Sequence, residues 1–191
     1  MAVEKERTIG EIHIHEFMSL DGVIDAPTWT ADFGFTPRMG ELIGGVMGDA
    51  TALLLGRTTH QMFEPAWSTR TAEDDPGAPF FNDATKYVVS STLVDPTWQN
   101  TTVLGRYNPT TIRQLKDAVA GRLYTSGSAT LVGALLADGL ADELHLFVYP
   151  LTRGDGPRLF PTVPIQGAIS LQACEGLENG VVYVNYRIEQ R

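Results

Sequence analysis

The chain has 191 residues, of which 43% are hydrophobic and 19% are charged, as is typical of a soluble globular protein. Its formal net charge of -9 disfavours a nucleic-acid partner, because neutralising phosphates requires a basic surface. The single cysteine, Cys174, excludes a disulfide within the chain and a metal site made of several thiolates. No apolar run approaches the roughly 20 residues that span a membrane, and no signal-peptide core is found at the start. We therefore expect a cytoplasmic protein with one domain over residues 1–191 and no membrane or nucleic-acid partner.

The first half of the chain alternates between strand and helix patterns. Residues 11–18 alternate and then become continuously apolar, which predicts a strand that an Asp-Gly turn ends. Thr36 and Pro37 are typical of a helix start, because a hydroxyl caps the first turn and proline fits the first helical position. Apolar residues then recur at helical spacing up to Met47. Further along we expect a buried strand at 52–55, a helix at 58–63 and a long surface loop at 64–83.

The second half continues the same alternation. Strands are predicted at 86–90, 101–104, 122–125 and 143–149. Capping-box spacing from Thr111 to Gln114 predicts one helix, and Ser128 is predicted to cap another that runs to about Asp138. An Asn-Gly pair at 179–180, between two alternating runs, indicates a hairpin. This order predicts an α/β fold with a mostly parallel sheet and an antiparallel edge.

Two strand-to-helix turns have the composition of phosphate sites. One carries Gly56, Arg57, Thr58 and Thr59, and the other is the small-residue turn Ser126, Gly127, Ser128 and Ala129. The first amides of a helix have no partner inside the helix, and the helix dipole adds partial positive charge there. Ser90 and Ser91 follow a third strand end. Each turn alone also fits an ordinary glycine turn, but together they indicate a ligand with more than one phosphate, a dinucleotide first of all.

Other common site types find little support. The second turn lacks the GxGxxG pattern and its downstream acid, so an ordinary Rossmann domain is not expected. His13 and His15 would share one face of a strand, but no third ligand follows at a defined spacing. His60 and His145 lack any partner motif, and no nucleophile elbow is present. We therefore expect no metal site and no hydrolase chemistry.

Asp21 and the loop behind it form a candidate substrate site. A carboxylate at the carboxyl edge of the sheet, close to Trp29 and Phe33, can bind and protonate a planar heterocycle. The alternative is a turn aspartate with loop aromatics that pack on the core. The sequence pattern leaves both interpretations open.

Six segments follow one another in a consistent order and cover nearly the whole chain. They are 18–24, 54–59, 86–91, 126–128, 139–144 and 154–160. Together they resemble the dihydrofolate reductase fold, and more closely its relative, the reductase domain of riboflavin biosynthesis, here in stand-alone form. The resemblance implies a three-layer α/β/α fold with a mostly parallel central sheet and an antiparallel C-terminal hairpin.

The resemblance also implies a cofactor and its contacts. NADPH is the cofactor implied, with residues 56–59 at its phosphates, Ser90 and Ser91 near the adenosine 2′-phosphate, and residues 126–129 as the pyrophosphate turn. The activity implied is similar to that of 5-amino-6-(5-phosphoribosylamino)uracil reductase, with hydride transfer to a small heterocyclic or ribosylamino substrate. Within that activity, Asp21 is our candidate for catalysis or substrate binding, and Trp29 is the candidate stacking surface.

The sequence also leads to an expectation for the oligomeric state and leaves two alternative functions open. Proteins of this family commonly pair through their sheet edges, so the resemblance implies a homodimer. One alternative is a dihydrofolate or other pterin reductase, which would need a carboxylate facing the pocket where the heterocycle stacks. The other is a non-catalytic NADP-binding dimeric protein, which would bind the cofactor without room for a substrate beside it.

Overall fold

A single eight-stranded sheet organises the chain, seen in a computed structural model that describes residues 10–25, 27–160 and 165–189. The strands lie in the order β4-β3-β2-β5-β1-β6-β8-β7. Pairing is parallel from β4 to β6 and antiparallel where β8 joins β6 and β7. The strands are β1 (Glu11–Ser19), β2 (Ala50–Gly56), β3 (Thr85–Val89), β4 (Thr101–Gly105), β5 (Arg122–Ser126), β6 (Glu143–Tyr149), β7 (Ala168–Gly176) and β8 (Val182–Glu189).

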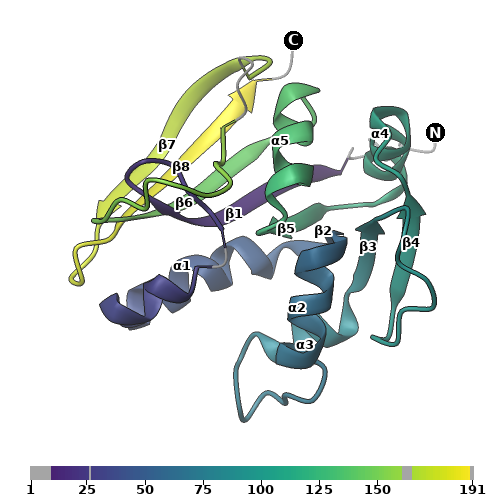
Figure 1. The fold of residues 1–191 in the computed structure, drawn as a ribbon, viewed down its shortest axis with the longest axis horizontal. Coiled ribbons are helices and arrows are strands. Elements are labelled where there is room, and N and C mark those ends of the chain that lie inside the picture. Colours follow the sequence, from purple (N-terminus) through teal and green to yellow (C-terminus); the bar gives the residue numbers. More distant parts are fainter. Residues whose placement is uncertain (1–9, 26, 161–164, 190–191) are drawn as a thin grey trace, which may run out of the picture.

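Helices cover both faces of the sheet, as Figure 1 shows. One face carries α1, α2 and α3, and the other carries α4 and α5. The helices are α1 (Pro37–Gly48), α2 (Arg57–Trp67), α3 (Ala78–Asp83), α4 (Pro109–Ala118) and α5 (Ala129–Ala137), with a 3-10 helix at Thr28–Phe33. The three-layer α/β/α fold with a mostly parallel sheet and a C-terminal hairpin is therefore confirmed.

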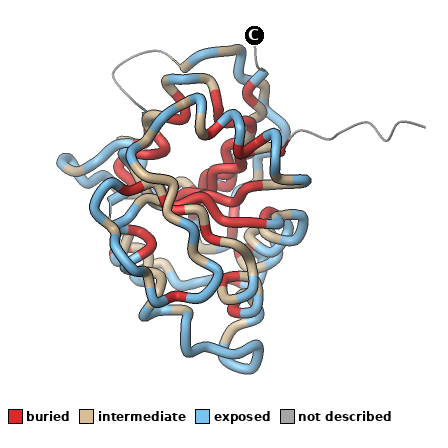
Figure 2. Tube along the Cα trace, turned by 90° about the vertical axis from the view of Figure 1, so that its right-hand side faces the viewer, coloured by how far each residue is buried: buried red, intermediate tan, exposed pale blue. Residues whose placement is uncertain are grey.

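The burial of its side chains agrees with the central position of β2 in the sheet. Leu53, Leu54 and Leu55 of β2 are all fully buried, because helices cover both of its faces. In Figure 2 the buried segments gather at the centre of the molecule, where the sheet lies. Among the described helices, none has both the length and the apolar character needed to cross a bilayer.

Two expectations about local structure are wrong. The segment 64–83 is not one long loop: α2 continues to Trp67, and 78–83 forms the short helix α3, whose Phe81 is buried against Trp67. The helix expected from Thr111 starts earlier, at Pro109, and its N-cap is Asn108, whose side chain accepts from the Thr110 amide at 2.8 Å. In the first case an apolar contact forms a helix in a segment whose composition predicts a loop, and in the second case a capping side chain starts the helix earlier than the spacing predicts.

Candidate functional site

A cavity of about 770 Å³ lies at the carboxyl ends of β1, β2, β3 and β5. These strands are parallel, so their carboxyl ends meet at one edge of the sheet. All ten residues expected at the cofactor line this cavity: Gly56, Arg57, Thr58, Thr59, Ser90, Ser91, Ser126, Gly127, Ser128 and Ala129. Three segments that lie far apart in the sequence therefore form one wall. The volume lies within the range of roughly 300–1,000 Å³ that is usual for small-molecule sites.

Two helix N-termini open onto this cavity. α2 begins at Arg57 and α5 begins at Ala129, and both residues line the cavity. In these two fully described helices, no side chain caps the first turn and no acidic residue lies in it. Their first amides and the positive ends of their dipoles are therefore available to an anion from the cavity.

The predicted side-chain cap at Ser128 is wrong, and the reason bears on the site. Ser128 adopts a left-handed conformation with φ 58, and its hydroxyl accepts a hydrogen bond from the Gly56 amide at 2.9 Å. In return, the Ser128 amide donates to the Thr59 hydroxyl at 2.9 Å. These two bonds join the turns after β2 and β5. The side chain that was expected to cap α5 instead fixes the distance between the two helix N-termini.

Glycine is required at position 127 of the second turn. Gly127 has φ +60, and a Cβ built there would lie 3.1 Å from the hydroxyl oxygen of Thr59. A larger residue would be strained by its own backbone and would also press on the Thr59 side chain that holds the turn. The turn therefore presents bare backbone to the cavity, as close approach to a pyrophosphate demands.

The part of the cavity next to the turn after β3 is basic and rich in hydroxyl groups. Arg57 and Arg106 are exposed and line it together with Ser90, Ser91 and Thr92. The Ser90 hydroxyl accepts from the amides of Thr92 and Leu93, at 3.1 and 2.9 Å, and this shapes the turn after β3. Two guanidinium groups beside hydroxyls match the charge and donor geometry of a phosphomonoester.

Glu16 is the residue of this site that the sequence interpretation missed. It lies on β1, is 2% exposed and lines the cavity. The Gly127 amide donates to its carboxyl group, while Oε1 has no hydrogen-bond partner among the described residues. Burial raises the pKa of Glu16 well above its usual value, although the bond from Gly127 opposes this. Burial therefore favours the protonated form of the carboxyl group, which is the form able to donate a proton.

A signal for Glu16 was present in the sequence. The residue follows Ile12 and Ile14 at strand spacing, and both isoleucines are fully buried on the same face of β1. A carboxyl group at the third position of that apolar row is unusual, because burying a charge is costly. The His-x-His-Glu pattern drew attention to a metal cluster instead.

The structure places Asp21 elsewhere. Asp21 is not among the described residues that line the cavity, and its carboxylate holds a loop together. It accepts from the Ser19 hydroxyl at 2.6 Å and from the amides of Arg153 and Gly154 at 3.0 and 2.8 Å. The Ser19 bond and then the amide bonds hold the pKa of Asp21 far below its usual value. An anion stabilised in this way is a poor proton donor, so the geometry favours the turn interpretation.

Trp29 also packs away from the cavity. It is 8% exposed and meets Tyr149 edge to face, with ring centroids 5.2 Å apart. It belongs to a second apolar cluster that includes Met39 of α1 and Phe147 of β6. The stacking role expected for Trp29 therefore does not fit its position, and the apolar walls of the cavity come from Phe17, Ile24 and Pro27 instead.

Comparisons with known proteins agree with this fold. Residues 11–183 match the RibD C-terminal domain family. A protein from Shewanella sp. PV-4 assigned to riboflavin biosynthesis has a similar fold, with 17% identity, a TM-score of 0.71 and coverage of 94% of this chain and 99% of that chain. The dihydrofolate reductase of Enterococcus faecalis, solved with NADP(H), gives 16% identity, a TM-score of 0.57 and coverage of 95% and 98%. No curated protein sequence matches the chain.

The third comparison concerns a bifunctional protein. The Thermotoga maritima diaminohydroxyphosphoribosylaminopyrimidine deaminase/5-amino-6-(5-phosphoribosylamino)uracil reductase has 15% identity and a TM-score of 0.65. The match covers 94% of this chain but only 57% of that protein. Because the family match spans most of the sequence and the sheet carries the expected cavity, the chain belongs to the RibD C-terminal domain family and is an oxidoreductase.

Proposed function

We propose that the protein is an NADPH-dependent reductase that transfers a hydride to a ribosylaminopyrimidine, as 5-amino-6-(5-phosphoribosylamino)uracil reductase does. The observation that carries this proposal is the convergence of ten predicted cofactor residues on one cavity with two uncapped helix N-termini. We also propose that it is a homodimer, as the resemblance implies, and that it is cytoplasmic, as the sequence analysis predicts.

The residues of the cavity fit NADPH by their chemistry. The bare turn at Gly127 and the free amides at the starts of α2 and α5 suit the pyrophosphate. Arg57, Arg106 and Ser91 suit the additional phosphate that distinguishes NADPH from NADH. When bound, the cofactor supplies the hydride, and the protein positions the substrate and excludes water.

Glu16 supplies the proton in this proposal. Reduction of a carbon–nitrogen double bond places a hydride on carbon and a proton on nitrogen. Glu16 is the buried acid of the cavity, its carboxyl group accepts from the Gly127 amide, and its Oε1 has no hydrogen-bond partner among the described residues. It therefore takes the role that the sequence interpretation gave to Asp21.

Two alternatives are less well supported. A pterin reductase needs a carboxylate from the helix that follows the first loop. The acid near the start of α1, Glu41, is exposed and pairs with Arg38 at 2.8 Å, outside the described lining of the cavity. A non-catalytic NADP-binding dimer would bind the cofactor but would not oxidise it with any pyrimidine or pterin, which a turnover screen distinguishes.

The direct test of the proposal is titration of the purified protein with NADPH and NADH, followed by protein fluorescence and thermal shift. NADPH should bind more tightly than NADH and should raise the melting temperature with the logarithm of its concentration above the Kd. NADPH oxidation should then follow when 5-amino-6-(5-phosphoribosylamino)uracil is added. Absence of binding for both nucleotides would refute the proposal.

Arg57→Ala should weaken NADPH binding by about 10- to 100-fold, because a hydrogen bond to a charged phosphate contributes about 1.5–3 kcal/mol. NADH affinity should change less if the guanidinium contacts the 2′-phosphate. Isothermal titration of both nucleotides measures the difference. Arg70→Ala is the matched control, since Arg70 is an exposed arginine that stacks on Trp67 away from the cavity. Equal losses in the two variants would contradict an assignment of Arg57 to the cofactor.

Gly127→Ala should destabilise the protein by about 1–2 kcal/mol, since a non-glycine residue at positive φ is strained. It should also weaken NADPH binding, because the methyl group presses on Thr59 at the turn. Chemical denaturation and the same titration measure both effects. Gly133→Ala is the control: it lies inside α5 with open space around it, so alanine should stabilise the protein by about 0.5–1 kcal/mol. Unchanged binding in Gly127→Ala would argue against close approach of a ligand to this turn.

A further inference from the structure

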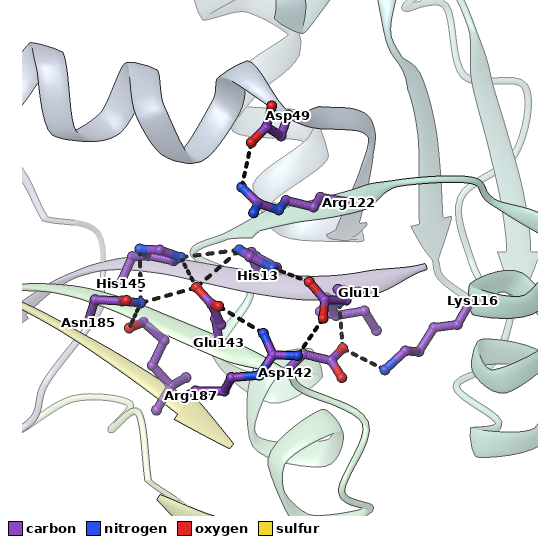
Figure 3. A network of polar contacts seen from close by, with 12 residues as sticks. Glu11, His13, Asp49, Lys116, Arg122, Asp142, Glu143, His145, Asn185 and Arg187 are labelled. Atoms are coloured by element: carbon purple, nitrogen blue, oxygen red, sulfur yellow. Dashed lines mark hydrogen bonds and ion pairs between the residues drawn. The ribbon is translucent and has the colours of Figure 1, made fainter. Parts of the chain in front are cut away.

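Three side-chain atoms of the types that can ligate a metal ion converge on the sheet outside the cavity. They are Nδ1 of His13, Nε2 of His145 and one carboxylate oxygen, Oε2, of Glu143. The two nitrogens lie 3.2 Å apart, and Oε2 lies 3.6 Å from the His13 nitrogen and 3.2 Å from the His145 nitrogen. Figure 3 shows the three side chains pointing toward one another from β1 and β6. None of them belongs to the described lining of the cofactor cavity.

The sheet holds these atoms in place. β1 and β6 pair in parallel, with His13 opposite Glu143 and His15 opposite His145. Glu143 and His145 are two residues apart on one strand, so their side chains share a face with that of His13. His13 is fully buried and His145 is 7% exposed, which restricts both rings. The triangle of ligand atoms is therefore set by the central strands and not by a flexible loop.

Each member of the triangle is oriented by a second contact. Nε2 of His13 bonds to the Glu11 carboxylate at 3.2 Å, and Nδ1 of His145 bonds to the Tyr183 hydroxyl at 2.9 Å. Metal-binding histidines usually have their other ring nitrogen held in this way, because the partner fixes the tautomer and the ring. When Nε2–H of His13 donates a hydrogen bond to the Glu11 carboxylate, the lone pair of Nδ1 faces the centre of the triangle.

The carboxylate of Glu143 is oriented in the same manner. Its second oxygen, Oε1, accepts from Arg187 at 3.0 Å, which leaves Oε2 toward the two rings. The Asn185 amide also donates to Oε2, at 3.3 Å. Apart from the two imidazoles, the carboxylates of Glu11 and Glu143 and the guanidinium of Arg187 sum to a charge of about -1. Arg122 nearby is neutralised by Asp49 at 3.0 Å, so the cluster attracts a cation.

We propose that His13, Glu143 and His145 bind one Zn²⁺ ion. In a tetrahedral site with bonds of about 2.0–2.1 Å, neighbouring ligand atoms lie roughly 3.3–3.4 Å apart. The three observed separations of 3.2, 3.2 and 3.6 Å match the edges of such a site. Two histidines and one carboxylate suit zinc, and a water completes the fourth position. The Glu143 side chain, 15% exposed, provides the route from solvent.

The sequence pattern missed the site because its members are not local. His13 and His145 are 132 residues apart, so no spacing motif connects them. Only the pairing of β1 with β6 brings them together. The ion would link these two strands, and through Tyr183, Asn185 and Arg187 it would also support β8. The role we assign to it is stabilisation of this part of the sheet, separate from the proposed reductase site.

The experiment uses the full chain, free of any affinity tag and stripped of metal with a chelator. Titration with ZnCl₂ against a metal indicator should show uptake of one equivalent, together with a rise in melting temperature. Co²⁺ should give the intense visible absorption of a tetrahedral site. His145→Gln should lower the Zn²⁺ affinity by at least about 100-fold and abolish the Co²⁺ spectrum, since two ligands remain. Wild-type protein that takes up no zinc, or that gives only a weak octahedral Co²⁺ spectrum, would overturn the proposal.

Two further variants separate the site from general damage. His60→Gln removes a buried imidazole on α2, far along the sheet beside Trp98, and should leave the zinc stoichiometry at one. Glu11→Gln keeps all three ligands but weakens the partner of His13, so zinc affinity should fall by about 10- to 100-fold. Zinc uptake that is equal in wild type and His145→Gln would refute the assignment, whether or not NADPH binds.

Discussion

Glu16→Gln is expected to lower kcat for the reduction of 5-amino-6-(5-phosphoribosylamino)uracil by about 10²- to 10⁴-fold, the usual contribution of general acid catalysis. Glutamine keeps the shape of the side chain and can still accept from the Gly127 amide, but it has no acidic proton. NADPH affinity should therefore change little. Steady-state kinetics with a separate NADPH titration make this comparison.

The same variant should be more stable than the wild type at neutral pH. The pKa of Glu16 is raised in the folded protein, so in wild type the unfolded chain loses its proton first. Below pH 4.5 both states are protonated and there is no penalty. As the pH rises above this value, wild-type stability falls by about 1.4 kcal/mol per pH unit until the folded pKa is reached. Glutamine removes this slope.

These two readouts distinguish a functional acid from a structural one. A variant that is more stable but much slower has lost a catalytic proton, whereas a purely structural Glu16 would change stability without the loss in kcat. Glu178→Gln, at the exposed hairpin turn, is the control for replacing a carboxyl group by an amide at the surface and should alter neither quantity. Full activity of Glu16→Gln would remove the residue from the mechanism.

Lys116→Met should destabilise the protein by about 3–5 kcal/mol, because it leaves a buried carboxylate without its cation. Lys116 and Asp142 are 8% and 7% exposed, and Nζ lies 2.5 Å from Oδ2. The same oxygen accepts from the Ile12 amide at 2.7 Å. The pair therefore anchors α4 to the starts of β1 and β6. Urea denaturation monitored by circular dichroism measures the loss.

An exposed pair and a double variant serve as controls. Arg38→Met breaks the surface pair with Glu175 and should change stability by no more than about 1 kcal/mol, since exposed ion pairs contribute little. Lys116→Met combined with Asp142→Asn removes the stranded charge but keeps an acceptor for Ile12. It should recover part of the lost stability. A double variant less stable than Lys116→Met would show that the stranded charge is not the cause.

The local patterns of the sequence were sufficient for most of the element order and for the residues that line one wall of the cavity. Strand and helix periodicities depend on which residues face a core, so β2 and α5 can be located from a few apolar positions. The turns at Gly56 and Gly127 can be identified for the same reason, since their geometry depends on small residues at strand ends. Their convergence in one cavity then follows from parallel pairing.

Contacts between segments that are distant in the sequence could not be predicted from those local patterns. The Phe81–Trp67 stacking that accompanies α3, and the bond from Gly56 to Ser128, join residues with no local signature. Asp21 shows the limit most clearly: a carboxylate after a strand was expected to face a substrate. Its hydrogen bonds to the amides of Arg153 and Gly154 were not predictable from either segment.

The sequence by itself therefore determined the α/β architecture, the order of its elements and the two glycine turns that line the cavity, because these depend on periodicity and on backbone freedom over a few residues. Only the tertiary structure decided which ionisable groups are buried and what they meet. It buried Glu16 in the wall of the cavity, made Asp21 a loop anchor, and brought His13 to Glu143 and His145. The state of an ionisable side chain depends on its surroundings, which chain folding assembles from distant parts of the sequence.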